Sequence, residues 1–394
     1  ASRAALLTGC YPQRVGVKGV FFPNRGHQGL NPAYVTIAET LKGAGYATAA
    51  VGKWHLGDQQ EFLPTNQGFD QYYGIPYSND MHPASNMQYA ADCLFRDGQS
   101  PQTLREAFAG TLRKGSPPSL KNKVPLMRNT ACIEFPADQS TITRRYADEG
   151  IRFISQSVNA GQPFFLYLAN SMPHTPLHAS PAFKGKSERG LYGDTIEEID
   201  FHTGRILDHL SRLGIEENTI VIFTSDNGPW LVKGDHAGSA RPLFEGKFTC
   251  FEGGCRVPFV IKWPARIAAG SVCAEVASTI DLHPTLARLA GAPLPDMPLD
   301  GQDITGLMTA RSGATSPHEH LFLVHRGRAV RSGAWKFHQT MHFSTMGDRH
   351  DRTEPALFNL AQDIGETTNV IGAHPEIAAG LAQALDEHLR RMGR

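Results

Sequence analysis

The sequence lacks an excess of charge of either sign. Its 394 residues include 38 Lys and Arg and 38 Asp and Glu, so the formal net charge is zero. Nucleic-acid binding as a main role needs a basic face, and the charge balance argues against that role. No run of about 18 apolar residues occurs, so the sequence predicts no transmembrane segment.

Cysteine is scarce, and its spacing is irregular. The six cysteines show neither a C-x-x-C motif nor the spacing of zinc ligands, which argues against a structural zinc site. They are Cys10, Cys93, Cys132, Cys250, Cys255 and Cys273. The sequence allows two alternatives, which are free buried thiols and up to three disulfides. Cys250 and Cys255 are close enough in sequence for a local bridge.

The composition is that of a folded globular protein. Hydrophobic residues make up 41% and charged residues 19%, and the length suits one large domain with a smaller appendage. Apolar runs alternate with helical patterns. Strands are expected at 47–51, 164–169, 219–224 and 257–261, and helices at 35–43, 141–157, 195–213 and 282–290. Buried strands that alternate with helices predict an α/β fold with a mostly parallel sheet.

Two stretches depart from this alternation. Residues 79–137 contain Pro and Gly but few periodic runs, and they are expected to form an insertion over the site. Beyond about Leu307 the pattern changes to short strands and a final helix, expected at 321–324, 334–338 and 375–392. We therefore expect a large α/β domain at 1–307 and a small α+β subdomain at 308–394.

Three of the expected strands end in polar clusters. These clusters are GKWHLG, NSMPHTPLH and SDNG, which begin at Gly52, Asn170 and Ser225. In open parallel sheets, ligands bind beyond the carboxyl ends of the strands. The three clusters are therefore expected to share one site.

The side chains of these clusters suit an oxyanion and a cation. Lys53 and His55 place an ammonium close to an imidazole, which fits charge neutralisation and proton transfer at an oxyanion. The adjacent oxygens of Asp226 and Asn227 suit a hard cation such as Ca²⁺. Each cluster alone also fits a plainer structure, which is a solvated loop at Lys53 and a turn at Asp226.

The ordered motifs resemble those of type I sulfatases, in the arylsulfatase A-like branch of the alkaline-phosphatase superfamily. Residues 1–9 (ASRAALLTG) resemble the end of the signature C-x-[PA]-S-R-x-x-x-L-T-G, and GKWHLG matches the family segment at every position. Residues 246–258 resemble the signature G-K-x-x-x-x-E-G-G-x-R-x-P, whose Glu252 and Arg256 are expected to organise the loop. GIPYS at 74–78 fits the same branch, and the resemblance runs over nearly the whole chain.

The resemblance implies an alkaline-phosphatase-like fold, with helices flanking the sheet, and hydrolysis of sulfate esters. In the family a Cys is oxidised by a maturation enzyme to formylglycine, whose hydrate attacks sulfur. That Cys is expected two residues before Ala1, and Cys10 is no substitute because it follows the Gly of the signature. Two acidic ligands of the metal, Ca²⁺ or alternatively Mg²⁺, are also expected upstream. The chain as given is therefore expected to be inactive.

The resemblance also implies roles for residues near the first motifs. Arg3 would stabilise the hydrate, and Lys53 would bind the sulfate. His55 would contact the nucleophile and act as a base. Ser78 would hydrogen-bond the sulfate, with a turn serine as the alternative.

Four further residues receive roles from the later motifs. His174 would contact the sulfate and protonate the leaving group, and Lys247 would reach both the sulfate and the nucleophile. Asp226 and Asn227 would ligate the metal. We assign no role to His178.

The implied substrate is a small-molecule or glycan sulfate ester, and the implied partner is a formylglycine-generating maturation enzyme. Export to the periplasm, the lysosome or the cell exterior is usual for the family. Two alternatives stay open: a phosphonate monoester hydrolase or phosphodiesterase of the same superfamily, and a non-catalytic binding protein on the sulfatase scaffold. A Cys or Ser two positions before Ala1 would favour an enzyme.

Overall fold

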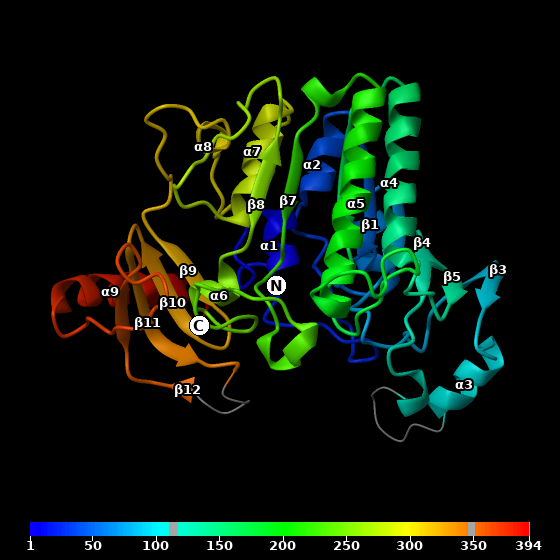
Figure 1. Cartoon of the computed structure of the whole chain (residues 1–394), viewed down its shortest axis with the longest axis horizontal. Helices are drawn as coiled ribbons and strands as arrows, with labels where there is room; N and C mark the ends of the chain where they lie inside the picture. The colour runs from blue at the N-terminus through cyan, green and yellow to red at the C-terminus, as the bar shows by residue number, and fades with distance from the viewer. Residues whose placement is uncertain (110–116, 346–350, 394) are drawn as a thin grey trace. The chain divides into compact units, whose positions relative to one another are not determined.

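The computed structural model describes residues 1–109, 117–345 and 351–393, and these fall into two compact units (Figure 1). The units are made of segments that are not contiguous in sequence. Unit 1 contains Ala1, Arg3–Glu216 and His283–Asp300, whereas unit 2 contains Ser2, Glu217–Leu282 and Gly301–Arg394. This division does not coincide with the predicted domains 1–307 and 308–394. A compact unit is not necessarily a folding domain, so the predicted division stays a prediction.

Unit 1 is built on a six-stranded sheet in the order β3-β5-β4-β2-β1-β6. Its strands are β1 (Ala47–Lys53), β2 (Gln71–Ile75), β3 (Tyr89–Phe95), β4 (Leu126–Arg128), β5 (Ala131–Phe135) and β6 (Phe164–Ala169). β1 runs parallel to β2 and β6, and β3 runs parallel to β5, whereas β4 is antiparallel to both neighbours. The sheet is mixed and mostly parallel, which confirms the predicted fold class.

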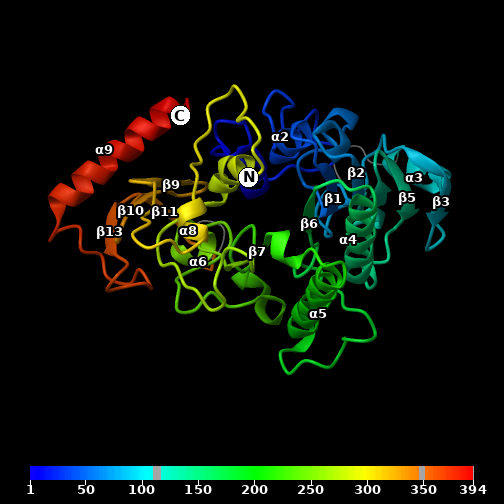
Figure 2. The same cartoon turned by 90° about the horizontal axis from the view of Figure 1, so that it is seen from above.

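Helices pack on this sheet through apolar faces. The long helices α4 (Ile142–Asn159) and α5 (Gly190–Arg212) lie side by side (Figures 1 and 2), and α4 contacts β1 and β6. The other helices assigned wholly or mainly to unit 1 are α1 (Ser2–Thr8), α2 (Ile37–Gly43), α3 (Pro101–Ala109) and α7 (Leu282–Leu289). Thr36 caps the N-terminus of α2, where a capping box with Glu39 satisfies the first backbone N–H groups.

The predicted insertion at 79–137 contributes strands to the sheet. It supplies β3, β4 and β5, with α3 between β3 and β4. The sequence pattern gave no clear signal for β3 and β4, because β4 has only three residues and none of the residues of β3 is buried. Residues 110–116 of the stretch lie outside the described part of the chain.

Unit 2 contains an antiparallel sheet covered by one long helix. The sheet follows the order β12-β11-β10-β9, with β13 paired to β11, and α9 (Pro375–Arg391) lies along it (Figure 2). Its strands are β9 (Leu321–Val324), β10 (Arg328–Ser332), β11 (Trp335–His342), β12 (Asp351–Arg352) and β13 (Ala356–Asn359). Val330, Phe337 and Leu385 are among the residues of the core between sheet and helix. The predicted strands and final helix of the C-terminal region are confirmed.

The strand predicted at 219–224 forms, but its pairing and its exposure differ from the prediction. It forms β7 (Val221–Thr224), which pairs antiparallel with β8 (Phe259–Lys262) in a separate two-stranded sheet. Phe223 is 45% exposed and Val260 is 62% exposed, so the prediction of a buried strand in the main sheet was wrong. Apolar composition alone does not show which partner a strand takes. Two short helices complete unit 2, α6 (Glu252–Cys255) and α8 (Thr305–Met308).

The structure also bears on the cysteines and on membrane-spanning helices. All six cysteines are free thiols, so Cys250 and Cys255 form no bridge in this structure. Among the described residues, no helix combines the length and the apolarity that a membrane span requires.

Candidate functional site

Two glycines let the strand ends of unit 1 approach closely. A Cβ on Gly52 would lie 2.0 Å from the carbonyl oxygen of Ala169, and a Cβ on Gly74 would lie 1.8 Å from the carbonyl oxygen of Gly52. Any other residue at either position would push the strands apart. The carboxyl ends of β1, β2 and β6 therefore meet tightly, and the side chains that follow them are brought together.

Three of these side chains form a contiguous polar chain. The Nζ of Lys53 donates to Ser78 Oγ at 3.3 Å, and Ser78 Oγ lies 3.2 Å from His174 Nδ1. Lys53 ends β1, Ser78 follows β2, and His174 follows β6. The expected convergence of polar clusters at strand ends is confirmed for Lys53 and His174, whereas Ser78 lies outside the three predicted clusters and the SDNG cluster lies in unit 2.

Arg3 joins this group from α1. Its Nη1 donates to the carbonyl oxygen of Lys53 at 2.7 Å and to the hydroxyl of Tyr167 at 3.3 Å. Tyr167 lies on β6, and its contact was not predicted because it lies within an apolar strand pattern. We call Arg3, Lys53, Ser78 and His174 the strand-end cluster.

Asn79 orients His174 and was missed by the sequence analysis. Its Nδ2 donates to the carbonyl oxygens of His174 at 3.0 Å and Pro176 at 2.9 Å, and its Oδ1 lies 3.1 Å from His174 Nδ1. His174 Nδ1 also lies 2.7 Å from the carbonyl oxygen of Thr175. A carbonyl only accepts, so Nδ1 carries the proton, and in the neutral ring Nε2 is the basic nitrogen. The available signal for Asn79 was its place directly after Ser78.

His55 lies half-buried beside the strand-end cluster. Its Nε2 lies 3.1 Å from the carbonyl oxygen of Phe21, so Nε2 carries a proton and Nδ1 holds the lone pair. Burial lowers the pKa of His55 well below its usual value, and the positive charges of Lys53 and Arg3 lower it further. The imidazole is therefore neutral near neutral pH and able to accept a proton at Nδ1.

The Asp226–Asn227 turn in unit 2 is tied to the backbone of α6. Asn227 Nδ2 donates to Asp226 Oδ1, and Ser225 Oγ donates to the carbonyl oxygen of Asn227 at 2.9 Å. The next residue, Gly228, donates its N–H to the carbonyl oxygen of Gly254 at 3.0 Å. The turn is thus held by its neighbours in sequence and by a segment 26 residues away.

Lys247 is held over an aromatic ring in the same unit. Its backbone N–H donates to the carbonyl oxygen of Pro229 at 2.8 Å, and its Nζ lies 4.9 Å from the ring centre of Trp230 and 5.3 Å from that of Phe248. A cation above an indole is attracted by the ring quadrupole. Trp230 was missed, although it directly follows the SDNGP segment.

The donors at Asp226 and Asn227 fit Ca²⁺ or Mg²⁺ in kind. Both residues offer hard oxygen atoms, a carboxylate and a carboxamide. Ca²⁺ takes about six to eight oxygen ligands, which is more than two residues supply. Over the described ranges, no cluster of three or more His, Cys, Asp and Glu residues is arranged to hold a metal ion. Asp226 and Asn227 therefore offer the kind of ligand atoms that the ion prefers, but fewer of them than it takes.

The structure thus places the eight predicted residues in two groups. Arg3, Lys53, His55, Ser78 and His174 lie together in unit 1, and the other three, Asp226, Asn227 and Lys247, lie in unit 2. That all eight serve a single site stays a prediction.

Comparison with known proteins gives a consistent result. A family model described as Sulfatase matches residues 1–292, and one described as N-sulphoglucosamine sulphohydrolase, C-terminal, matches residues 241–393. The chain is 37% identical to arylsulfatase A of Homo sapiens, with 97% of this chain and 76% of that protein aligned. It is 35% identical to steryl-sulfatase of Mus musculus over 99% of this chain and 74% of the relative. It is 34% identical to N-acetylgalactosamine-6-sulfatase of Canis lupus familiaris over 93% of this chain and 71% of the relative.

Solved structures share the fold. The structure of Ps i-CgsB in complex with k-i-k-neocarrahexaose matches with a TM-score of 0.77 and 29% identity, and the match covers 98% of this chain and 80% of that one. The phosphonate monoester hydrolase SpPMH from Silicibacter pomeroyi matches with a TM-score of 0.63 and 17% identity over 99% of this chain and 85% of that one. The second likeness concerns the fold alone.

Proposed function

Because the chain belongs to the sulfatase family and is a sulfuric ester hydrolase, we propose that it cleaves its substrate with a formylglycine nucleophile and a Ca²⁺ ion. The observation that carries this proposal is the Lys53–Ser78–His174 chain, with distances of 3.3 and 3.2 Å. It offers an ammonium, a hydroxyl and an imidazole at one edge of a sheet, as the binding and release of a sulfate ester require.

Lys53 and Ser78 bind the sulfate group in this proposal. Both side chains are buried, so the ammonium acts on the sulfate oxygens with little screening by water. Arg3 donates to the carbonyl oxygen of Lys53 and keeps the end of β1 in place, and its charge would stabilise the hydrate. Charge that grows on the sulfate oxygens during reaction is stabilised by these fixed donors.

His174 and His55 move the protons. His174 has its Nδ1–H held by Thr175 and Asn79, so Nε2 is the atom that takes up the second proton, and the imidazolium then delivers this proton to the leaving oxygen. His55 stays neutral because burial lowers its pKa, and it accepts a proton at Nδ1. The two imidazoles therefore take opposite roles through their surroundings.

A metal ion and a formylglycine would complete the chemistry. Asp226 and Asn227 would hold the metal with their side-chain oxygens, and Lys247 would neutralise sulfate charge beside it. A Ca²⁺ ion supplies positive charge, and a hydrated formylglycine, from the position two residues before Ala1 in the signature, supplies a nucleophilic hydroxyl. A formylglycine-generating enzyme is the partner that this nucleophile requires.

The substrate class is a sulfate ester of a sugar or of a small alcohol. The names of the relatives support both, since one is an N-acetylgalactosamine-6-sulfatase and one is a steryl-sulfatase, and one solved neighbour holds a neocarrahexaose. We further propose that the protein is exported, as is usual in the family.

The test is sulfate release by the full-length protein produced together with a formylglycine-generating enzyme. Hydrolysis of 4-nitrophenyl sulfate that needs added Ca²⁺, and that is lost in Lys53→Ala and His174→Ala, would support the proposal. Faster turnover of a phosphonate monoester would favour the other hydrolase of the superfamily. No turnover of either ester, with formylglycine confirmed by mass spectrometry and Ca²⁺ present, would leave a binding protein and overturn the proposal.

A further inference from the structure

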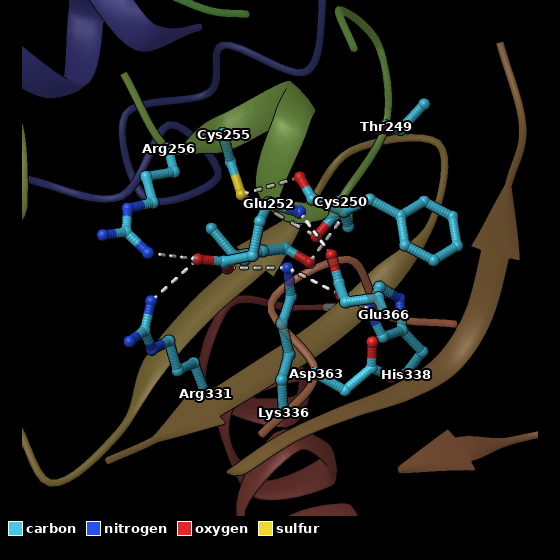
Figure 3. Close-up of polar contacts among 12 residues, drawn as sticks. Thr249, Cys250, Glu252, Cys255, Arg256, Arg331, Lys336, His338, Asp363 and Glu366 are labelled. Atoms are coloured by element: carbon cyan, nitrogen blue, oxygen red, sulfur yellow. Dashed lines mark hydrogen bonds and ion pairs between the residues drawn. The ribbon is translucent and has the colours of Figure 1, made fainter. Parts of the chain in front are cut away.

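A buried ion network lies in unit 2 below α6 (Figure 3). Lys336, on β11, is fully buried, and its Nζ lies 2.9 Å from Glu252 Oε1 and 3.1 Å from Glu366 Oε1. Glu252 is the first residue of α6, and its backbone N–H donates to Glu366 Oε2 at 2.6 Å. One lysine thus bridges two carboxylates, and one of these carboxylates also caps the helix.

Two further residues complete the network. Arg331 Nη1 lies 2.9 Å from Glu252 Oε2, and His338 Nε2 lies 2.9 Å from Glu366 Oε1. Burial lowers the pKa of His338, so the ring is neutral and acts through its hydrogen bond. Burial alone would raise the pKa of Glu366, but Lys336 and His338 outweigh burial and lower it. Two cations therefore balance two carboxylates within this network, with Arg256 as a more distant exposed cation, 3.8 Å from Glu252.

α6 lies in turn against both candidate segments of unit 2. Gly228, next to Asn227, donates its N–H to the carbonyl oxygen of Gly254, and a Cβ on Gly228 would lie 1.8 Å from the carbonyl oxygen of Gly253. A Cβ on Gly254 would lie 2.4 Å from the carbonyl oxygen of Gly246, which precedes Lys247. A small shift of α6 would therefore move both segments.

We infer that Lys336 and Glu366 are positioning residues for the Asp226–Asn227 turn and for Lys247, which they hold in place through Glu252 and α6. The inference rests on the proposed function, since it is for sulfate hydrolysis that these segments need fixed positions. Neither residue needs to touch the substrate. Apolar side chains would fill the same space without desolvating four charges. The ionic contacts hold both the backbone N–H and the side-chain carboxylate of Glu252, and this fixes the position of the helix.

The test compares the network with another buried hydrogen-bonded pair of side chains in the same unit. Lys336→Met removes the bridging charge, and Arg331→Met removes the partly exposed cation, so it keeps the test valid if the first variant does not fold. His318→Gln is the matched control, because His318 Nε2 pairs with buried Asp281 at 2.6 Å and no contact with α6 is described for it. All variants are made in the full-length matured protein.

Two readouts separate positioning from general stability. The first is amide hydrogen exchange in peptides that cover 226–230 and 244–256, which needs no activity. The second is the Ca²⁺ concentration for half-maximal sulfate release, expected to rise about tenfold or more in the network variants, as for other residues that support metal ligands. We expect faster exchange in both peptides for Lys336→Met and Arg331→Met, and no change there for His318→Gln at a similar loss in melting temperature.

Each outcome decides the inference. If the network variants lose melting temperature as the control does, with unchanged exchange at 226–230 and an unchanged Ca²⁺ requirement, the network is structural only and the inference fails. If the wild-type protein releases no sulfate, the proposed function fails, and the exchange data alone then decide whether the network positions the two segments.

Discussion

The strand-end cluster of unit 1 and the ion network of unit 2 hold candidate residues in contrasting ways. In unit 1 the scaffold is a sheet whose strands approach closely at Gly52 and Gly74, and hydrogen bonds of 3.3 and 3.2 Å complete the arrangement. In unit 2 the candidate residues lie on loops, and these loops contact a four-residue helix that is anchored by buried charges. Residues at the edge of a sheet are positioned by the strands themselves, whereas residues on loops need another support, which buried ion pairs supply here.

The largest expected effect tests the dependence of unit 2 on charge. Lys336→Met leaves Glu252 and Glu366 with one near cation fewer, and breaking a buried pair typically lowers the free energy of unfolding by about 3–5 kcal/mol. The double variant Lys336→Met with Glu366→Gln restores the balance of charge and should recover part of this loss. Urea denaturation measures both. Equal stability of the single and double variants would contradict the electrostatic account.

The next effect tests whether both units serve catalysis. Lys53→Ala and Lys247→Ala each remove one ammonium, and each is expected to lower kcat/KM for an aryl sulfate by about 10²–10³-fold. Lys42→Ala is a control of the same kind, because Lys42 pairs on the surface with Asp70. Steady-state kinetics of the matured protein measure the three variants. Activity that survives the change in one unit would confine catalysis to the other.

A smaller effect concerns the residue that orients His174. Asn79→Ala removes the donor to the His174 and Pro176 carbonyls, and kcat should fall about tenfold while KM changes less. Asn79→Asp keeps an acceptor for Nδ1 and adds a negative charge, which raises the pKa of the imidazole. The pH profile of kcat should then extend to higher pH on its alkaline side. An unchanged profile would show that Asn79 has no part in the function of His174.

The smallest effect is the pH dependence of stability. The pKa values of His55 and His338 are lowered by burial, so below about pH 6.5 the unfolded chain binds protons that the folded chain does not. Stability is therefore full above that pH and falls as the pH decreases. Glu366, whose pKa is also lowered, adds to the loss below about pH 4.5. Melting temperatures from pH 4 to 8 measure this, and His338→Gln should reduce the slope; an unchanged slope would mean that His338 contributes nothing.

The parts that the sequence predicted well are those with local signals. The run FFLYLA predicts β6 with its observed bounds, and polar clusters at strand ends predict that Lys53 and His174 share one site; Ser78 was a candidate only through the family resemblance. These inferences rest on periodicity and on the geometry of parallel sheets, both of which are written in a few adjacent residues.

The parts that it missed depend on distant partners. Nothing near Lys336 indicates that this residue on a C-terminal strand bonds a carboxylate 84 residues earlier, and Trp230 gains its role only from the position of Lys247. The exposure of β7 was missed for the same reason, since a four-residue apolar segment does not indicate which strand it will pair with. Pairing across the chain is a property of the fold and not of a window of sequence.

The distance along the chain between Glu252 and its partners also sets an order of events during synthesis. Lys336 emerges from the ribosome 84 residues after Glu252, and Glu366 emerges 114 residues after it. Until then Glu252 has neither of these partners, and a helix of four residues has little tendency to form alone. The anchoring of α6, against which the loop of Lys247 packs, is therefore completed only after both partners have been synthesised.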